Sequence, residues 1–384
     1  MRIAAAAGGV LVATAIALGV ASAVACQTTG GILPRRQDSA HAQRIDSTVR
    51  AVLAARNIPG ATIGVLFRDT VLHIGAYGMS DLARRIPASP ATVFQIGSLT
   101  KPMTALAVLL LADQGRLGLD DAASRYVPAL PARYSDITIR QLLTHTSGIS
   151  PDMRTANVDE MPLEEFWTRL SERPSAFPPG ANVQYANAGY AILSFAVERV
   201  SGMDFGAFLQ RRVFAPLGMR SSGYRVARTS DTRHAVGYDL VEGHNQEQPH
   251  VFSGWGNSGV ETTIEDLARF AAAIDRRELL SARSWDLVFS PGLLATGVPA
   301  SFTFGEARAS YGMGWFLTTS RGRPLHTHGG AIAGFSSILN RYPDERYTVI
   351  VLSNGKQGED RLGQADAIAR AVDQVRESGR AGRP

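Results

Sequence analysis

Lysine and cysteine are almost absent from this chain of 384 residues. Only Lys101 and Lys356 among its 39 basic residues are lysines, and all the others are arginines. Arginine keeps its charge and cannot give up its proton, so each retained lysine is a candidate for a role that arginine cannot fill. Cys26 is the only cysteine, which excludes a disulfide within the chain.

Other absences exclude whole classes of protein. The net charge is only +5 and no run of arginine and lysine is longer than a pair, so the basic footprint of a nucleic-acid-binding protein is missing. Beyond residue 25, no aliphatic stretch approaches the ~20 residues that cross a membrane. The balance of 45% hydrophobic and 19% charged residues instead indicates an ordinary globular protein.

The motifs of several enzyme classes are missing as well. The chain has no Gly-x-Ser-x-Gly, which argues against the α/β-hydrolase arrangement, and no Gly-x-x-x-x-Gly-Lys-Ser/Thr phosphate loop. His326 and His328 could form half of a metal site, but no His-Glu-x-x-His motif and no nearby third ligand completes it. We therefore expect neither a metal nor a cofactor.

The first 25 residues are typical of an export signal. Arg2 gives a positive start, residues 3–25 are apolar or small, and Ala23-Val24-Ala25 fits a small-x-small cleavage site. Cys26 follows directly, either as an incidental residue or as the lipidated first residue of a bacterial lipobox. We favour the lipobox, because the only cysteine of the chain stands at that one position. We expect an exported protein of the periplasm or cell envelope, which would contact the membrane only through this anchor.

Hydrophobic periodicity predicts strands at both ends of the chain and helices between them. A helical pattern over 45–56 is followed by two β-rich runs, 61–67 and 71–77, which form a hairpin. Four more strands are predicted near the C-terminus, before a closing helix over 361–376; they are 314–319, 324–327, 335–341 and 347–353.

This order of elements predicts an α+β fold. An antiparallel sheet would be built from N- and C-terminal segments and flanked by helices, with a mostly helical subdomain inserted. After the signal and a tether over 26–42, we expect one domain over 43–378. Its sheet part would take about 43–95 and 305–378, and its helical part 96–304. A disordered tail is expected over 379–384.

Ser98 and Lys101 are the first candidates for chemistry. Leu99 to Leu111 has a helical pattern, and Pro102 is tolerated only near a first turn, so Ser98 lies at or beside a helix start. Residues three apart on a helix share a face. A serine hydroxyl needs a neighbour to take its proton, and a desolvated lysine can do so because burial lowers its pKa. The helix N-terminus also suits a developing oxyanion.

Ser-x-x-Lys alone is a common string, but it becomes specific when other motifs of one family follow it in a fixed order. The segment Phe94–Lys101 resembles the active-site segment of the serine β-lactamase and penicillin-binding DD-peptidase superfamily. Further segments follow in the order of that family, over about 45–354: Leu142-Leu143-Thr144-His145-Thr146-Ser147-Gly148-Ile149, Phe177-Pro178-Pro179-Gly180 with Tyr185-Ala186-Asn187-Ala188-Gly189-Tyr190, Pro216-Leu217-Gly218-Met219, and His328-Gly329-Gly330 with Gly334-Phe335-Ser336-Ser337.

The resemblance implies a role for each matching residue. Ser98 would be the nucleophile and Lys101 its base, and Tyr185 would carry a proton to the leaving group as a phenolate or as a phenol in a relay. Asn187 would hydrogen-bond Lys101 or a substrate amide. Gly330 closes the third motif, and the backbone N–H groups of Ser98 and Ala331 would form the oxyanion hole. His145 is expected to be a structural histidine, and Trp255 and Trp315 either line the cleft or pack the core.

The third motif departs from the β-lactamase pattern. Most penicillin-binding enzymes and class C β-lactamases have Lys-Thr-Gly there, whereas this chain has His328-Gly329-Gly330. A neutral histidine offers a substrate carboxylate a hydrogen bond in place of a permanent positive charge. A His-x-Gly form occurs in some DD-peptidases and in related esterases. We therefore expect a serine hydrolase for small-molecule esters, amides or peptidoglycan-derived peptides, ranked above a true β-lactamase and above a catalytically silent ligand- or peptidoglycan-binding relative.

Overall fold

The structure is a computed structural model that describes residues 39–150, 161–226, 231–250, 254–304, 307–357 and 363–381. The predicted signal over 1–25, and Cys26 with its predicted anchor, lie outside the described residues. Within the described ranges no helix is long and apolar enough to span a membrane.

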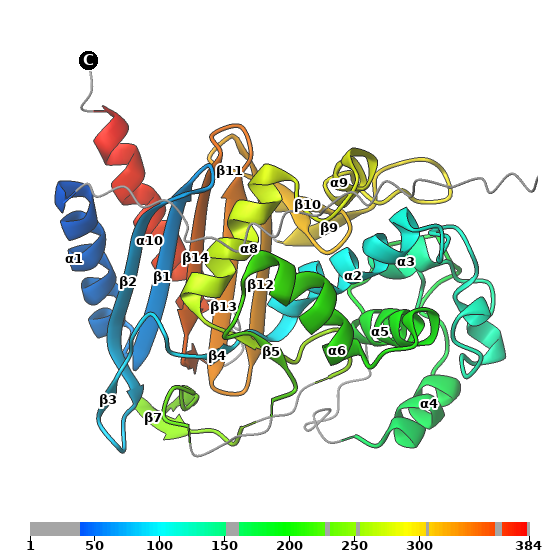
Figure 1. Ribbon diagram of the computed structural model, residues 1–384, viewed down its shortest axis with the longest axis horizontal. Coiled ribbons are helices and arrows are strands. Elements are labelled where there is room, and N and C mark those ends of the chain that lie inside the picture. The colour runs from blue at the N-terminus through cyan, green and yellow to red at the C-terminus, as the bar shows by residue number, and fades with distance from the viewer. Residues whose placement is uncertain are drawn as a thin grey trace, which may run out of the picture.

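A nine-stranded antiparallel sheet joins the two ends of the described chain, as the sequence predicted (Figure 1). Its strand order is β3-β2-β1-β14-β13-β12-β11-β10-β9. The N-terminal strands are β1 (Gly60–Phe67), β2 (Thr70–Asp81) and β3 (Ile86–Pro87). The C-terminal strands are β9 (Ser301–Phe304), β10 (Ala307–Tyr311), β11 (Phe316–Ser320), β12 (Arg323–Ile332), β13 (Phe335–Tyr342) and β14 (Tyr347–Ser353).

Alternation along the central strands gives the sheet two apolar faces. One face packs against α1 (Ser39–Ala55) and α10 (Gly363–Ala381). Ile45, Val49 and Leu53 recur every four residues, so they form the buried stripe of α1. Ile63 of β1 lies opposite Val351 of β14, and both side chains belong to this cluster.

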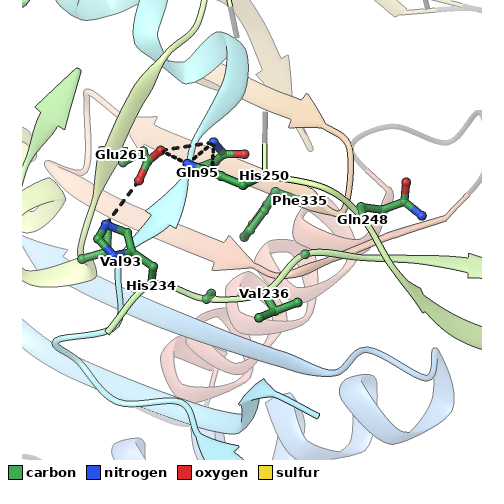
Figure 2. Close-up of a pocket in the computed structure, with 10 residues that line it drawn as sticks. Val93, Gln95, His234, Val236, Gln248, His250, Glu261 and Phe335 are labelled. Atoms are coloured by element: carbon green, nitrogen blue, oxygen red, sulfur yellow. Dashed lines mark hydrogen bonds and ion pairs between the residues drawn. The ribbon is translucent and has the colours of Figure 1, made fainter. Parts of the chain in front are cut away.

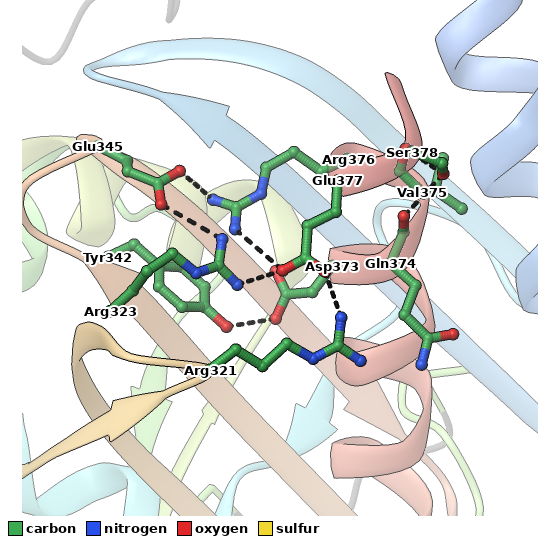
Figure 3. A network of polar contacts seen from close by, with 10 residues as sticks. All are labelled: Arg321, Arg323, Tyr342, Glu345, Asp373, Gln374, Val375, Arg376, Glu377 and Ser378. Atoms are coloured by element: carbon green, nitrogen blue, oxygen red, sulfur yellow. Dashed lines mark hydrogen bonds and ion pairs between the residues drawn. The ribbon is translucent and has the colours of Figure 1, made fainter. Parts of the chain in front are cut away.

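Polar contacts fix α10 to the turn between β13 and β14 (Figure 3). The Arg376 guanidinium stacks over the rings of Tyr342 and Tyr347, at 4.7 and 4.4 Å from their centres. It also forms a 2.6 Å ion pair with Glu345, and the Tyr342 hydroxyl donates to Asp373 over 2.5 Å. A buried charge that is paired and stacked in this way avoids the cost of an isolated one.

The opposite face is covered by α8 (Ile264–Arg276), which crosses in front of β1 and β14 in Figure 1. Gly64 of β1 faces this helix, and a Cβ there would lie 3.4 Å from the Ile264 side chain, at ordinary contact distance. Although α8 falls within the range expected for the helical part, it belongs to the sheet layer. Sequence pattern predicts a helix but not the surface on which it packs.

The helical part is organised around α2 (Lys101–Asp113), of which eleven residues are buried. Around it lie α3 (Ile139–Leu143), α4 (Leu163–Glu172), α5 (Asn187–Ser201), α6 (Phe205–Leu209), α7 (Ala215–Leu217) and α9 (Ala282–Val288). Two small sheets complete the described chain: β4 (Phe94–Gln95), β8 (Val260–Thr262) and β5 (Gly223–Tyr224), then β15 (Gly355–Gln357), β6 (Tyr238–Val241) and β7 (His244–Glu247).

Three expected boundaries differ from the structure. The C-terminal part of the main sheet begins at Ser301 in β9, before the expected residue 305. Helix α1 starts at Ser39, inside the expected tether over 26–42. Helix α10 continues to Ala381, so residues 379–381 are helical where a disordered tail was expected. Periodicity placed the outer ends of α1 and α10 too close to the middle of each helix, and it did not predict β9.

Candidate active site

Ser98 lies between strand β4, which belongs to one of the small sheets, and helix α2. Strand β4 leads into the 3₁₀ turn η1 (Gly97–Thr100), and α2 then begins at Lys101 with Pro102 in its first turn. The nucleophile thus stands in the turn that precedes the α-helix. Gly97 has φ +51° and packs against β12, because a Cβ there would lie 3.0 Å from the backbone nitrogen of Ala331. A side chain at 97 would be strained and crowded at once.

Lys101 is fully buried and surrounded by oxygen atoms. Its Nζ lies 3.0 Å from Ser98 Oγ, 2.8 Å from Asn187 Oδ1 and 2.9 Å from the carbonyl oxygen of Asn257. Burial lowers the pKa of Lys101 well below its usual value, because a charged amine is poorly solvated there. A neutral amine has two N–H groups, which the two asparagine oxygens accept. Its lone pair is then left for the hydroxyl proton of Ser98.

The Asn257 carbonyl was missed by the sequence reasoning. It is presented by a loop, 254–259, in which Gly254, Gly256 and Gly259 all have positive φ. The loop is fixed to α2, since Thr104 Oγ1 donates to the Gly256 carbonyl over 2.6 Å. Three glycines within six residues were the available signal, because such spacing marks backbone that approaches another group closely.

Tyr185 completes the proton-handling set. Its ring centre lies 4.7 Å from Lys101 Nζ, and its hydroxyl is hydrogen-bonded to Ser98. Burial raises the pKa of Tyr185 above its usual value, and the bond to Ser98 offsets only part of that effect. The group is therefore a phenol at neutral pH. Asn187 follows at the first residue of α5 and is exposed, so a bound substrate can reach its amide.

Strand β12 approaches the nucleophile turn very closely. A Cβ on Gly330 would lie 1.8 Å from the carbonyl oxygen of Ile96, so only glycine fits there. Ser337 of β13 donates to the same carbonyl over 2.8 Å. This contact places the Ala331 backbone beside Gly97, one residue from Ser98. The assignment of the Ser98 and Ala331 N–H groups to an oxyanion hole stays a prediction, and the packing is compatible with it.

His328 lies behind the site, and this corrects one expectation. The side chain is 1% exposed. Nε2 is 2.9 Å from the Tyr311 hydroxyl, and Nδ1 is 2.7 Å from the Gly329 carbonyl. Burial and the nearby Lys101 lower the pKa of His328 to about 3, so it is neutral. Nδ1–H donates to Gly329 and Nε2 accepts from Tyr311, so neither nitrogen is left to hydrogen-bond a substrate carboxylate. Tyr311 was not among the predicted site residues, and the pairing of β10 with the sheet brings it to His328.

The family is decided by comparison with known proteins. The Beta-lactamase family model matches residues 45–373. The chain belongs to the β-lactamase family. It is a serine hydrolase of the β-lactamase and penicillin-binding group.

Relatives and solved structures agree with this assignment. Penicillin-binding protein 4* of Bacillus subtilis (strain 168) is 30% identical over 329 residues, which cover 79% of this chain and 69% of that protein. Protein flp of Staphylococcus aureus (strain MW2) is 28% identical, over 81% of this chain and 63% of that protein. The chain thus spans about two thirds of the length of these curated relatives. An octameric penicillin-binding protein homologue from Pyrococcus abyssi has a TM-score of 0.74 at 25% identity, over 88% of this chain and 77% of that one. The D-amino acid amidase from Ochrobactrum anthropi SV3, with a TM-score of 0.74 at 22% identity over 88% and 99% of the two chains, shares the fold.

Two further aromatic residues were candidates for the cleft of this β-lactamase-family protein. Trp315 is 2% exposed and belongs to the main core cluster. Trp255 is half-buried and packs edge-on against Phe166, at 5.2 Å between ring centres. Trp315 is therefore a core residue, while Trp255 lies in the loop that presents Asn257. Among the described residues, no group of three histidine, cysteine, aspartate or glutamate side chains is arranged to hold a metal ion, and the His326 ring stacks on Phe289.

A second polar cluster lies beneath the strand that leads to Ser98 (Figure 2). Glu261 of β8 is opposite Gln95 of β4, and Gln95 Nε2 donates to Glu261 Oε1 over 3.1 Å. His250 and His234 approach the same carboxyl group, at 3.1 and 3.4 Å. Burial raises the pKa of Glu261 to about 7. Because Gln95 is three residues before the nucleophile, this cluster anchors the approach to the active site.

Proposed function

We propose that this protein hydrolyses uncharged carboxylic esters and amides, as an esterase in preference to a DD-carboxypeptidase, through an acyl-enzyme on Ser98. The observation that carries the proposal is the setting of Lys101. A fully buried amine has two acceptors for its N–H groups and a third neighbour, Ser98 Oγ, at 3.0 Å. This arrangement suits a neutral base held against a nucleophile.

The neutral amine of Lys101 and the phenol of Tyr185 together account for the proton transfers of acylation. Ser98 Oγ attacks the substrate carbonyl carbon while its proton passes to Lys101 Nζ, which becomes an ammonium. The bond to the leaving group breaks, and the phenol of Tyr185 supplies the proton that the leaving group needs. The products of this half-reaction are the ester of Ser98, the released alcohol or amine, and a Lys101 cation beside a Tyr185 phenolate. These opposite charges stabilise one another, because Nζ lies 4.7 Å from the ring centre.

Deacylation reverses the same transfers with water in place of the leaving group. The Tyr185 phenolate takes a proton from water as the oxygen attacks the acyl carbon. The bond to Ser98 Oγ breaks, and Lys101 returns its proton to that oxygen. A carboxylic acid is released and all three groups regain their initial state, so the cycle consumes one water for each bond hydrolysed.

The surroundings of β12, the strand that carries the third motif, favour substrates without a carboxylate. His328 is buried and neutral, and the Phe316 ring stacks parallel to Tyr185 with 6.1 Å between ring centres. A substrate carboxylate placed beside these groups would lose hydration and gain no cation from position 328. Small esters lose nothing there. We therefore rank ester and neutral amide hydrolysis above β-lactam hydrolysis.

Intact-mass spectrometry of the whole protein tests the proposal. The protein would be exposed separately to a p-nitrophenyl ester, a fluorescent penicillin and a fluorophosphonate. We expect the ester and the fluorophosphonate to add mass on the peptide that carries Ser98, a much weaker reaction with penicillin, and no adduct on Ser98→Ala. A silent binding protein would form no adduct with any probe. An adduct on another residue, or a penicillin that reacts far faster than the ester, would overturn the proposal.

A further inference from the structure

His145 holds the backbone on both sides of Tyr185. Its own backbone has φ +59°, and its carbonyl accepts the N–H of Gln184 over 2.9 Å. Its Nδ1 accepts the N–H of Ala186 over 3.3 Å. Gln184 and Ala186 are the two chain neighbours of Tyr185. One residue from a different loop therefore accepts the backbone N–H groups of both chain neighbours of Tyr185.

The imidazole ring of His145 also supports the ring of Tyr185. The two ring centres are 4.4 Å apart with a tilt of 38°, and the Tyr311 ring is 4.6 Å away on another side. His145 is 1% exposed, so this packing excludes water from behind the phenol. Rotation of Tyr185 away from Ser98 would require these rings to separate.

The hydrogen bond from the Ala186 N–H defines the protonation state and the tautomer of His145. Nδ1 can accept only if the ring is neutral and carries its proton on Nε2. Burial, with Lys101 and His328 nearby, keeps the pKa of His145 well below its usual value. Nε2 is buried and has no hydrogen-bond partner in the described part of the chain. An apolar side chain would avoid that unsatisfied N–H, so packing alone does not account for a histidine here.

We infer that His145 is a positioning residue, whose neutral Nδ1 and ring hold the Tyr185 phenol where it can protonate the leaving group. The inference rests on the proposed function, in which Tyr185 is the proton donor. It assigns no contact between His145 and the substrate.

Leaving groups of different basicity make the inference testable. A p-nitrophenolate departs without a proton, whereas the alkoxide of an ethyl ester or the amine of an amide needs one. Misplacement of a catalytic group by about 1 Å can cost on the order of 100-fold in rate. Because both esters give the same acyl-enzyme, only kcat/KM, which reports acylation, depends on the leaving group. We expect His145→Leu to lower kcat/KM about 100-fold for an ethyl ester of the same acyl group, with a few-fold change at most for the p-nitrophenyl ester.

Two substitutions separate the acceptor from the packing. In His145→Asn the side-chain Oδ1 stands near the position of Nδ1, and asparagine tolerates the left-handed backbone. In His145→Gln the corresponding oxygen lies one bond further out. We expect Asn to recover most of the ethyl-ester rate and Gln to recover little. The comparison of the Asn and Gln variants tests the role of the Nδ1 acceptor even if the Leu variant fails to fold.

A double-mutant cycle gives the last control. In a Tyr185→Phe background there is no phenol to position, so adding His145→Leu should produce no further loss on the ethyl ester. Equal losses on both esters, full additivity with Tyr185→Phe, or a Gln variant as active as the Asn variant would each overturn the inference. Failure of the proposed function would look different, because the unsubstituted protein would then form no Ser98 adduct with any probe.

Discussion

Lys101→Arg should inactivate the enzyme almost as fully as Lys101→Ala, although arginine preserves the positive charge. At pH 7 an ordinary lysine is neutral in only about 0.04% of molecules. The burial of Lys101 lowers its pKa well below the usual value and so raises that neutral fraction. A guanidinium with a pKa above about 12 would be neutral in less than about 1 in 10⁵ molecules.

The size of the effect follows from the role assigned to the amine. A positioned general base typically contributes about 10²–10⁴-fold to the rate. We therefore expect kcat/KM for a p-nitrophenyl ester to fall about 10³-fold or more in both variants. In the unsubstituted protein, activity should fall as pH decreases through the lowered pKa of Lys101, because a protonated amine cannot accept the proton of Ser98.

The chain supplies its own matched control. Lys356 is the only other lysine, and its Nζ lies 3.7 Å from Asp239 in a small sheet distinct from the one that leads to Ser98. Lys356→Arg should keep the parent rate. The assay is ester hydrolysis with circular dichroism to verify folding. If Lys101→Arg kept activity within about tenfold of the parent protein, Lys101 would be an electrostatic or structural residue and not the base.

Two more predictions concern other parts of the molecule. Burial raises the pKa of Glu261 to about 7, against ~4.3 in an unfolded chain, so between those values the folded protein holds a proton that the unfolded protein has released. Glu261 by itself should therefore lower stability by roughly 3 kcal/mol as pH rises from about 4.5 to 7, whereas the buried neutral histidines contribute in the opposite direction. In urea unfolding, Glu261→Gln should lose this negative contribution, so its stability should change with pH along a more positive slope than that of the parent; equal slopes in the two proteins would contradict the assignment. For export, we propose that Cys26 is lipidated, so that the full chain fractionates with membranes and Cys26→Ser releases it or blocks its processing. Unsubstituted protein that begins at residue 26, carries no lipid mass and remains in the soluble fraction would exclude the anchor.

Local sequence patterns predicted much of the fold. The β-rich runs 61–67 and 71–77 predicted the hairpin of β1 and β2, and the apolar spacing after Ser98 predicted α2. Such patterns are readable because a strand or a helix repeats over a few residues, and each repeat decides which side chains are buried. The Ser-x-x-Lys spacing likewise placed Ser98 and Lys101 within contact distance from sequence alone.

The tertiary structure decided the properties that depend on distant segments. The Asn257 carbonyl meets Lys101 across 156 residues, and Tyr311 meets His328 through the pairing of strands. The sequence placed His328 in a motif but did not predict its burial. Because His328 is buried, it does not contact the substrate. Protonation states also depend on both sequence and tertiary structure. Residue type sets the ordinary pKa of a side chain. The desolvation that makes Lys101 a base and keeps Tyr185 a phenol arises only when the helices and the sheet pack around these two residues.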